Sequence, residues 1–291
     1  MARGIAARLA ASGIDTVVLV RRREVVAEAE AEIRRRIDRV VRNGGAGTIQ
    51  VSLDDVEPPF TLAVETIAED LDAKRAVLAR AERLLAGDGI LTTNTSSLRL
   101  TALDGALARP ERFAGWHWFN PAELVPLVEV IAGPRTDPAV IERLLELSRA
   151  MGKEPVAVRH DVPGFVANRL QYALLREAYA LVDAGVCDVD DVDRAVVAGL
   201  GARWAAIGPF ASMDAAGLEV HEAVAAQLFP RLSRSTAVPA LLRDLRRRGA
   251  TGARGGSGLR GTYGPGAARR LDEQRDATLA LLGCARRESA A

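Results

Sequence analysis

The residues best suited to acid–base chemistry lie in one stretch, where His117 stands between Trp116 and Trp118 and Glu129 follows in an apolar run. Of the three histidines in the chain, only this one has large apolar neighbours and a carboxylate closely following. Imidazole changes its charge near neutral pH, which suits a general base, although a lone histidine is more often a satisfied core residue. A buried carboxylate needs a partner, so we expect Glu129 to pair with His117 and to determine which ring nitrogen stays free.

The composition excludes several classes of protein. At 291 residues, 48% hydrophobic and 26% charged, the chain is long and apolar enough for two domains with their own cores. Its formal net charge of +1 offers no general attraction for a polyanion, so we predict no nucleic-acid partner. Cys187 and Cys284 are far apart and lack metal-ligand spacing, which argues against a disulfide or a metal site. No apolar run is long enough to span a bilayer, and we predict a soluble, cytoplasmic protein with no membrane partner.

Strands alternate with helices in the first half of the chain, which predicts an α/β fold with a doubly wound, mostly parallel sheet. The pattern begins with a helix over residues 1–12 and a strand over 15–20, whose continuously apolar residues 17–20 are typical of a strand covered on both faces. Gly44-Gly45 ends the next helix, and Asp54-Asp55 forms a turn. Further strands are expected at 48–53, 61–67, 89–93, 112–117, 127–131 and 155–158, and further helices at 24–42, 70–86 and 142–151.

The pattern changes after Asp161, where helices follow one another without a convincing strand. We therefore expect a Rossmann-like domain over residues 1–160 and an all-helical domain over residues 161–291. The glycine-rich run from Gly252 to Gly266 is interpreted as a mobile loop, with a phosphate or adenine site as the alternative. Helices of the second domain are expected at 165–184, 190–198, 216–228 and 237–248.

The start of the chain resembles the first crossover of a dinucleotide-binding fold whose opening strand is missing. In such a fold a glycine-rich turn precedes the first helix, so that the backbone can approach the pyrophosphate. Met1 and Ala2 stand at the end of that fingerprint, which makes Ala2 a candidate cofactor contact; an unrelated N-terminal helix is the alternative. The missing strand indicates either a misassigned start or a degenerate protein.

Polar and basic residues follow two of the predicted strands. Arg21, Arg22 and Arg23 follow the first strand, where NAD-binding proteins commonly carry an acidic residue, so Arg21 makes NADP an alternative to NAD. A solvated basic cluster is the other interpretation. The loop from Asn94 to Ser97 follows a buried strand, at the edge where open α/β sheets bind ligands, although such residues also form ordinary caps and turns.

Together these motifs resemble the 3-hydroxyacyl-CoA dehydrogenase family over nearly the whole chain. The resemblance rests on the segments Asn94–Ser97, His117–Pro121, Leu127–Val130, Pro163–Arg169 and Gly208–Phe210 with Asp214. It implies a Rossmann domain that binds NAD, a helical domain for substrate binding and dimerisation, and a homodimer. It also implies hydride transfer between NAD and a 3-hydroxyacyl-CoA, such as 3-hydroxybutyryl-CoA, in fatty acid metabolism.

The resemblance also implies roles for single residues. His117 becomes the base that takes the proton of the substrate hydroxyl, and Glu129 orients it. Ser96 matches a serine that hydrogen-bonds the substrate oxygen. Asn168, which the spacing alone leaves open as a surface amide, matches an asparagine that positions substrate and histidine.

On the cofactor side, the resemblance adds two residues to Ala2 and Arg21. Glu65 ends its strand and matches a glutamate near the nicotinamide ribose, and Asn94 belongs to the same edge of the sheet.

Two departures weaken the acyl-CoA assignment more than the dehydrogenase chemistry. Residues 43–59 are shorter than the helical hairpin that contacts CoA in the acyl-CoA enzymes, and residues 257–263 match their C-terminal glycine loop only loosely. The helical half is similar to gulonate 3-dehydrogenase and lambda-crystallin. A dehydrogenase of a small non-CoA 3-hydroxy acid is therefore one alternative, and a catalytically weak, truncated binding or structural relative is another.

Overall fold

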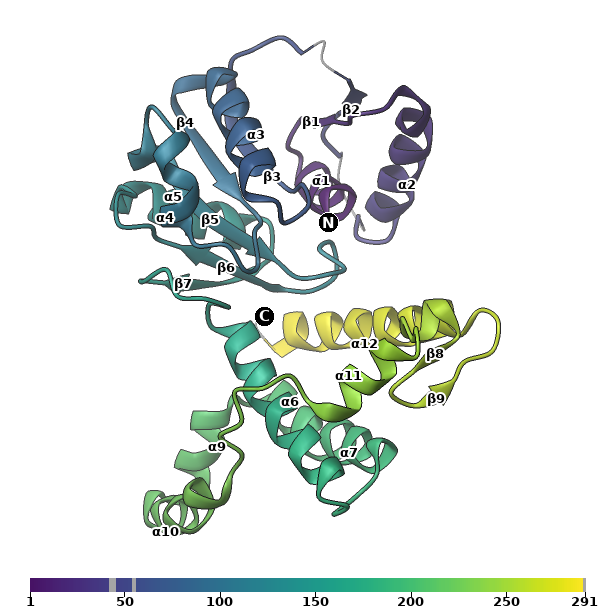
Figure 1. The fold of residues 1–291 in the computed structure, drawn as a ribbon. Helices are drawn as coiled ribbons and strands as arrows, with labels where there is room; N and C mark the ends of the chain where they lie inside the picture. The colour runs from purple at the N-terminus through teal and green to yellow at the C-terminus, as the bar shows by residue number, and fades with distance from the viewer. Residues whose placement is uncertain (42–45, 54–55, 290–291) are drawn as a thin grey trace. The chain divides into compact units, whose positions relative to one another are not determined.

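The computed structural model describes residues 1–41, 46–53 and 56–289, and it contains two compact units, Met1–Arg169 and Leu170–Ala291 (Figure 1). The predicted helix end at Gly44-Gly45 and the predicted turn at Asp54-Asp55 lie outside the described residues. None of the helices within the described ranges is long and apolar enough to cross a membrane.

The first unit alternates strands and helices, which confirms the predicted α/β class. Its helices are α1 (Ala2–Ala11), α2 (Val26–Asp38), α3 (Leu71–Arg83), α4 (Leu100–Leu103) and α5 (Pro138–Ala150). Its strands are β1 (Thr16–Leu19), β2 (Ile49–Ser52), β3 (Phe60–Glu65), β4 (Leu85–Thr93), β5 (Phe113–Trp118), β6 (Leu127–Ile131) and β7 (Glu154–Val158).

The strands of this unit form two sheets, where the alternating pattern predicts one. The larger sheet has the order β3-β4-β5-β6-β7. Its neighbouring strands pair in parallel except for β5 and β6, which pair antiparallel, and the smaller sheet pairs β1 with β2 in parallel. The two sheets separate between β1 and β3, because no ladder joins these two strands within the described residues. The mostly parallel arrangement is as predicted.

Helix α1 packs on both sheets because its apolar residues point in two directions. Ile5 and Leu9 join the core of the larger sheet, which contains Trp116 and Trp118. The small face formed by Ala6, Ala7 and Ala10 packs against β1 and α2 instead. The apolar spacing predicted the helix, and the alanines allow the close approach of α2.

The boundary between α3 and β4 differs from the prediction. The side chain of Asp70 caps α3 by accepting a hydrogen bond from the amide of Ala73, but the helix ends at Arg83 rather than at residue 86. Leu85 is paired with Phe60 on β3, so β4 begins there and is longer than the predicted strand over 89–93. Pairing with a neighbouring strand outweighs the local helical preference of this segment.

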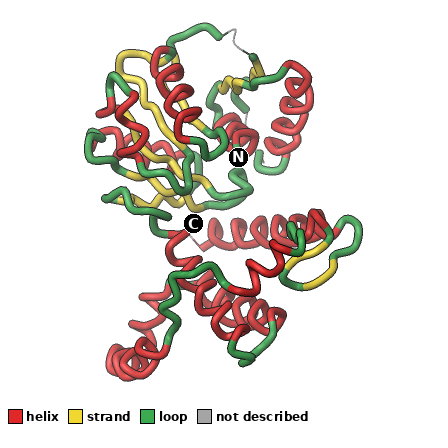
Figure 2. The backbone as a smooth tube through the Cα atoms, viewed as in Figure 1, coloured by secondary structure: helices red, strands yellow, loops and turns green. Residues whose placement is uncertain are grey.

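The second unit is largely helical, as predicted, with two corrections. A short hairpin of β8 (Ser257–Gly258) and β9 (Gly261–Thr262) stands where we expected no strand and a mobile loop (Figure 2). The expected helix over 216–228 begins two residues later, at Leu218, because Gly217 adopts a φ of 98° and separates it from a preceding helix that ends at Ala216. The helices are α6 (Ala167–Asp183), which begins in the first unit, α7 (Val189–Ala195), α8 (Ala202–Ala206), α9 (Pro209–Ala216), α10 (Leu218–Leu228), α11 (Ala240–Arg247) and α12 (Ala267–Ser289), and a π-helical segment covers Val196–Gly201.

Candidate active site

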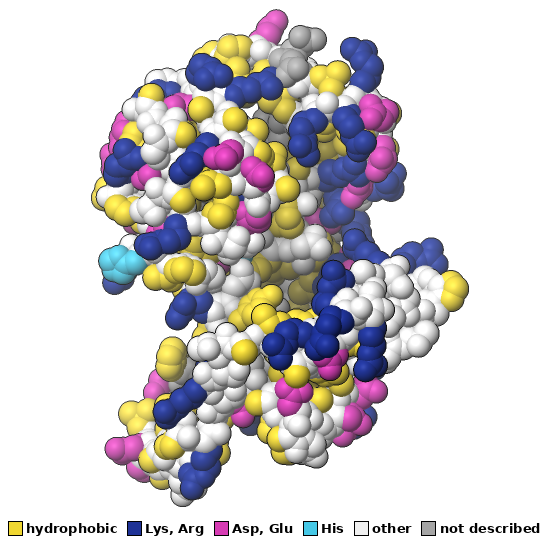
Figure 3. All heavy atoms as spheres, viewed as in Figure 1, with side chains coloured by type: hydrophobic (Ala, Val, Ile, Leu, Met, Phe, Trp, Pro, Cys, Tyr) yellow, Lys and Arg dark blue, Asp and Glu magenta, His cyan; other side chains and the backbone are white. Residues whose placement is uncertain are grey.

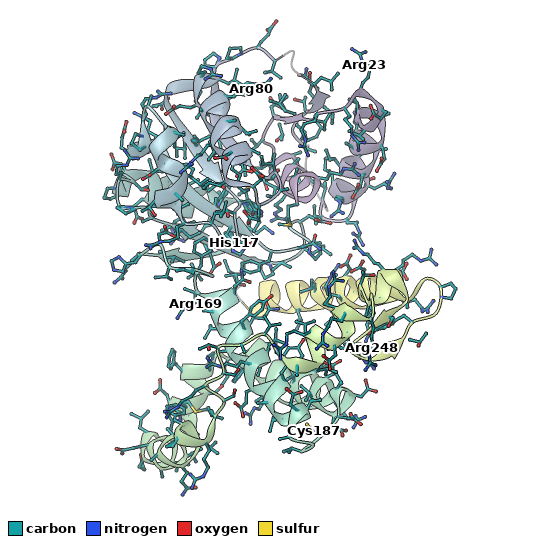
Figure 4. All side chains as sticks on the ribbon, in the orientation of Figure 1. Arg23, Arg80, His117, Arg169, Cys187 and Arg248 are labelled. Atoms are coloured by element: carbon teal, nitrogen blue, oxygen red, sulfur yellow. The ribbon has the colours of Figure 1, made fainter. Side chains whose placement is uncertain are left out.

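The structure brings His117, which is labelled in Figure 4, together with Glu129 in the larger sheet. They lie opposite each other on the antiparallel strands β5 and β6, and His117 Nδ1 lies 2.7 Å from Glu129 Oε2. Both side chains are buried. An ionised carboxylate only accepts hydrogen bonds, so Nδ1 of His117 carries the proton and donates a hydrogen bond to Glu129. The other ring nitrogen, Nε2, keeps its lone pair. This arrangement suits a base that receives a proton at Nε2.

Glu129 is held from its other side by the segment that leads into α6. Glu129 Oε1 accepts hydrogen bonds from the backbone amides of Val166 and Ala167, each at 2.9 Å. Burial raises the pKa of Glu129, but the hydrogen bond from His117 and those from the two amides outweigh burial and hold the pKa below its usual value. The carboxylate therefore stays ionised beside the histidine.

The backbone turn before α6 explains how these amides reach Glu129. Gly164 and Phe165 both have positive φ, 79° and 48°. For a residue with a side chain such as Phe165 this conformation is uncommon and costs on the order of 1 kcal/mol or more. Phe165 is buried, and its ring centroid lies 5.5 Å from that of His117. Packing thus retains a strained turn that directs two amides at the carboxylate of Glu129.

Asn168 follows directly in the first turn of α6. It is half-buried and lies one residue beyond Ala167, whose amide binds Glu129. Asn168 is thus adjacent in sequence to a residue that is hydrogen-bonded to Glu129.

Ser96 lies in the loop after β4 and is held by a carboxylate that the sequence patterns did not single out. Glu69 Oε1 accepts hydrogen bonds from the Ser96 amide at 2.7 Å and from Ser96 Oγ at 3.1 Å, and Glu69 also accepts from Thr95 Oγ1. Burial raises the pKa of Glu69, but these hydrogen bonds and the charge of Lys74 together outweigh burial. The pKa of Glu69 is therefore below its usual value. Its position between β3 and α3, at the carboxyl edge of the sheet, was the available signal.

Glu65 ends β3 in a buried ion pair. Both its carboxylate oxygens lie 2.9 Å from Lys74 Nζ, and it also accepts from Thr93 Oγ1 and from the amide of Ile67. Glu65 and Lys74 are almost fully buried. Glu65 therefore joins the ends of β3 and β4 to the start of α3, at the same edge of the sheet as Ser96.

Asn94 connects this edge to the strand that carries His117. Its Oδ1 accepts from the backbone amide of Trp118 at 2.8 Å, and its own amide donates to the carbonyl of Glu65. Asn94 thus fixes the loop after β4 against the end of β5.

Ala2 and Arg21 lie with the smaller sheet. Ala2 is the first residue of α1, whose free N-terminal amides and partial positive charge suit a pyrophosphate, and a small side chain leaves room for it. Arg21 is exposed two residues beyond the end of β1, and Figure 4 shows its neighbour Arg23 near the start of α2. These positions fit a dinucleotide lying along the carboxyl ends of the strands.

A mostly parallel sheet, a buried histidine–carboxylate pair and a polar loop at the carboxyl edge are the features of a nicotinamide-dependent dehydrogenase of the Rossmann class. Comparison with known families makes this specific. Residues 1–162 match the family model for the 3-hydroxyacyl-CoA dehydrogenase NAD-binding domain, and residues 164–260 match that for its C-terminal domain. The chain belongs to the 3-hydroxyacyl-CoA dehydrogenase family, and it is an NAD-dependent oxidoreductase.

Two similar proteins act on different substrates. The chain is 35% identical over 268 residues to 5-formyl-3-hydroxy-2-methylpyridine 4-carboxylate 5-dehydrogenase of Mesorhizobium japonicum, an alignment that covers 89% of this chain and 86% of the relative. It is 33% identical over 235 residues to the mitochondrial hydroxyacyl-coenzyme A dehydrogenase of Homo sapiens. That alignment covers 75% of this chain and 74% of the relative.

Solved structures show the same two kinds of relative. A crystal structure of 5-formyl-3-hydroxy-2-methylpyridine 4-carboxylic acid 5-dehydrogenase, described as an NAD+ dependent dismutase, matches with a TM-score of 0.91 and 33% identity, covering 97% of this chain and 94% of that one. The crystal structure of the (S)-3-hydroxybutyryl-CoA dehydrogenase of Ralstonia eutropha matches with a TM-score of 0.70 and 26% identity. That match covers 91% of this chain and 95% of the other chain.

Proposed function

We propose that this protein transfers hydride between NAD and a hydroxyl or aldehyde carbon of a small carboxylate that carries no CoA. NAD, when bound, supplies the hydride acceptor or donor. His117 then takes the hydroxyl proton at Nε2 as the carbon loses its hydride, either from an alcohol or from the hydrate that an aldehyde forms with water, and Glu129 stabilises the imidazolium that results. Ser96 and Asn168 are the residues that we propose to hold the substrate oxygen.

The observation that carries the choice of substrate class is the TM-score of 0.91 to the pyridine-carboxylate dehydrogenase, against 0.70 to the 3-hydroxybutyryl-CoA dehydrogenase. Both comparisons cover more than nine tenths of this chain, so the difference does not come from coverage. The short segment over residues 43–59 also supports a substrate without CoA. Oxidation of a 3-hydroxyacyl-CoA is the second candidate, favoured by the identity to the human enzyme.

The substrate class can be tested by following NADH absorbance with three candidate substrates. These are 5-formyl-3-hydroxy-2-methylpyridine 4-carboxylate, free 3-hydroxybutyrate and 3-hydroxybutyryl-CoA. We expect kcat/KM for one of the two CoA-free acids to exceed that for the thioester by at least tenfold, about 1.4 kcal/mol in transition-state binding. A higher kcat/KM for the thioester would favour a 3-hydroxyacyl-CoA as the substrate class. No turnover of any of the three compounds would contradict the proposal.

We also propose that the protein is a homodimer formed through the Leu170–Ala291 unit. Among the described residues of this unit only Ala250 and Gly258 are buried, although a unit of this size normally has a core of its own. Large apolar side chains are exposed instead, and Figure 3 shows hydrophobic side chains on the visible face of this unit. The most exposed include Phe210, Val197, Leu281, Tyr172 and Val186.

A second copy of the chain would cover these side chains symmetrically. Sedimentation velocity should therefore give twice the mass of the chain, and Phe210→Asp should shift the protein toward the monomer. An exposed polar position on the same unit, in the variant Ser235→Asp, serves as the control and should leave the mass unchanged. A monomer at micromolar concentration would refute this proposal.

A further inference from the structure

The loop over residues 121–126, which we call the hairpin loop, joins β5 to β6, the two strands that carry the histidine–carboxylate pair. The amides of Leu124 and Val125 close a turn within this loop by donating hydrogen bonds to the carbonyl of Pro121. Two buried charged side chains, Lys153 and Glu123, hold the loop in place, and the acid–base chemistry proposed above uses neither of them.

Lys153 holds the hairpin loop against the larger sheet. It lies one residue before β7, and its Nζ donates hydrogen bonds to the carbonyls of Ala122 at 2.6 Å and Val125 at 2.7 Å. Because β7 pairs with β6, Lys153 fixes the loop relative to the strand that carries Glu129.

Glu123 holds the same loop against α2. Both of its carboxylate oxygens accept hydrogen bonds from Arg36 Nη1, at 2.8 and 3.0 Å, and Arg39 Nη1 lies 3.6 Å from Oε1. The side chain of Glu123 has no exposed surface. A carboxylate buried to this extent is costly without a cation, so the pairing of Glu123 with α2 is strongly maintained.

Arg36 is itself held by a second carboxylate. Its Nε and Nη2 donate to Glu32 Oε1, one turn earlier on α2, at 3.0 and 2.7 Å, and Glu32 also accepts from Arg3 of α1. Burial lowers the pKa of Arg36, but its hydrogen bonds with Glu32 and Glu123 and the charges of these carboxylates outweigh burial and raise the pKa. Arg36 therefore stays charged, and α1, α2 and the hairpin loop share one group of charges.

The first turn of α1 lies close to the same loop. A Cβ atom at Gly4 would lie 2.7 Å from Glu123 Oε2 and 3.2 Å from the Cβ of Ala122, so the approach depends on a residue without a side chain. In an NAD-binding domain of the Rossmann class the pyrophosphate lies at the start of the first helix. Glu123 thus lies between the helix turn nearest the cofactor and the strands of the histidine–carboxylate pair.

The two sheets must keep a fixed relation for hydride transfer. Within the described residues no ladder joins β1 to β3, and Figure 1 shows β1, β2, α1 and α2 beside the five strands of the larger sheet. Cofactor and substrate carbon must be aligned, and a misplacement of about 1 Å can cost about 10²-fold in rate. Apolar packing of α1 is not directional, whereas a hydrogen-bonded charged pair fixes an orientation.

We propose that Glu123 and Arg36 are positioning residues, whose ion pair fixes α1 and α2, at the cofactor, relative to the hairpin that carries His117 and Glu129. The pair acts on the alignment of hydride transfer without touching the reacting atoms. This role rests on the proposed function of His117 as the base, but it does not depend on the substrate class.

Amide hydrogen exchange of an Arg36→Met protein, without cofactor or substrate, tests the contact itself. Methionine cannot donate to Glu123, and a carboxylate left without its cation favours an opening of the loop that returns it to water. We expect the amides of Leu124 and Val125 to exchange at least about tenfold faster than in the original protein.

Two controls separate this local effect from a general loss of stability. The amides of Ala108 and Arg109, which donate to Glu82 in another part of the unit, are the internal reference and should change much less. Arg34→Met makes the same substitution on the exposed face of α2 and should leave all four amides unchanged.

The effect on the reaction should be a split between kcat and NAD affinity. Because the pair does not touch the cofactor, Arg36→Met should lower kcat at least about tenfold, while the Kd for NAD measured by calorimetry stays within about threefold. Arg36→Lys keeps the charge and one donor, so its kcat and its loop exchange should lie between those of the original protein and Arg36→Met. It also provides a second test if Arg36→Met does not fold.

Three results would overturn this role. Unchanged exchange of Leu124 and Val125 in both Arg36 variants would show that Lys153 alone holds the loop. Equal acceleration of these amides and of the reference amides would show that Arg36 contributes only to general stability. A loss of NAD affinity as large as the fall in kcat would show that the pair serves cofactor binding and not alignment. Absence of turnover in the original protein would contradict the proposed function, whereas the exchange measurement decides the contact by itself.

Discussion

A His117→Gln protein is expected to fold normally and to lose turnover by about 10²- to 10⁴-fold, the usual contribution of a general base. Glutamine is close to histidine in size, and its side-chain amide can still donate a hydrogen bond to Glu129, so the buried carboxylate keeps a partner. What the variant lacks is a nitrogen lone pair that accepts the hydroxyl proton. The loss should therefore appear mainly in kcat, with a smaller effect on KM.

His160→Gln is the matched control, because His160 is an exposed histidine of the same unit. It should leave the rate unchanged. Steady-state NADH formation measures the rate, and circular dichroism confirms that both variants are folded. A folded His117→Gln protein with a rate within about threefold of the original would contradict the role of His117 as the base.

Lys74→Met is expected to lower the free energy of unfolding by about 3–5 kcal/mol, the usual cost of leaving one charge of a buried ion pair without its partner. Lys74 Nζ lies 2.9 Å from both carboxylate oxygens of Glu65, and both side chains are almost fully buried. Methionine has a similar length but no charge, so the carboxylate of Glu65 would remain buried without compensation. Urea unfolding followed by the fluorescence of the buried Trp116 and Trp118 measures the change.

Two further variants identify the cause of this loss. The double variant Lys74→Met with Glu65→Gln should recover at least about half of the lost stability, because a neutral amide no longer needs a counter-ion. Arg34→Met removes one member of the exposed Arg34–Glu30 pair on α2 and should change stability by no more than about 0.5 kcal/mol. A loss below about 1 kcal/mol in Lys74→Met would show that the pair contributes no more than a surface ion pair.

The sequence predicted the elements whose apolar spacing is unambiguous. The apolar run at residues 17–20 predicted a strand, which is β1, and alternation of strands with helices predicted the α/β class. The predicted covering of both faces of this strand was wrong, because only Val18 is buried and Leu19 is 44% exposed. The cost of burying Glu129 predicted a partner for it, and His117 was the one candidate histidine. These inferences succeed because hydrophobic periodicity and the energetic cost of a buried charge are properties of the residues themselves.

Other features depend on contacts between residues far apart in the chain. The end of α3 at Arg83 follows from the pairing of Leu85 with Phe60, which local helical preference does not contain. The hydrogen bonds that Ser96 donates to Glu69 join segments 27 residues apart. In the same way, the turn at Phe165 brings an amide to Glu129 where the Phe165 ring packs near His117, 48 residues earlier in the chain. None of these has a local pattern that predicts it.

The sequence by itself thus determined which residues are suited to dehydrogenase chemistry, and in which order strands and helices carry them. Tertiary structure decided how those residues are held: His117 opposite Glu129 through strand register, and Ser96 against Glu69 at the sheet edge. It also decided that β1 and β3 face each other across a cavity rather than pairing. The physical reason is that composition and periodicity act locally, whereas register, ion pairing and packing are set by partners that only the folded chain brings together.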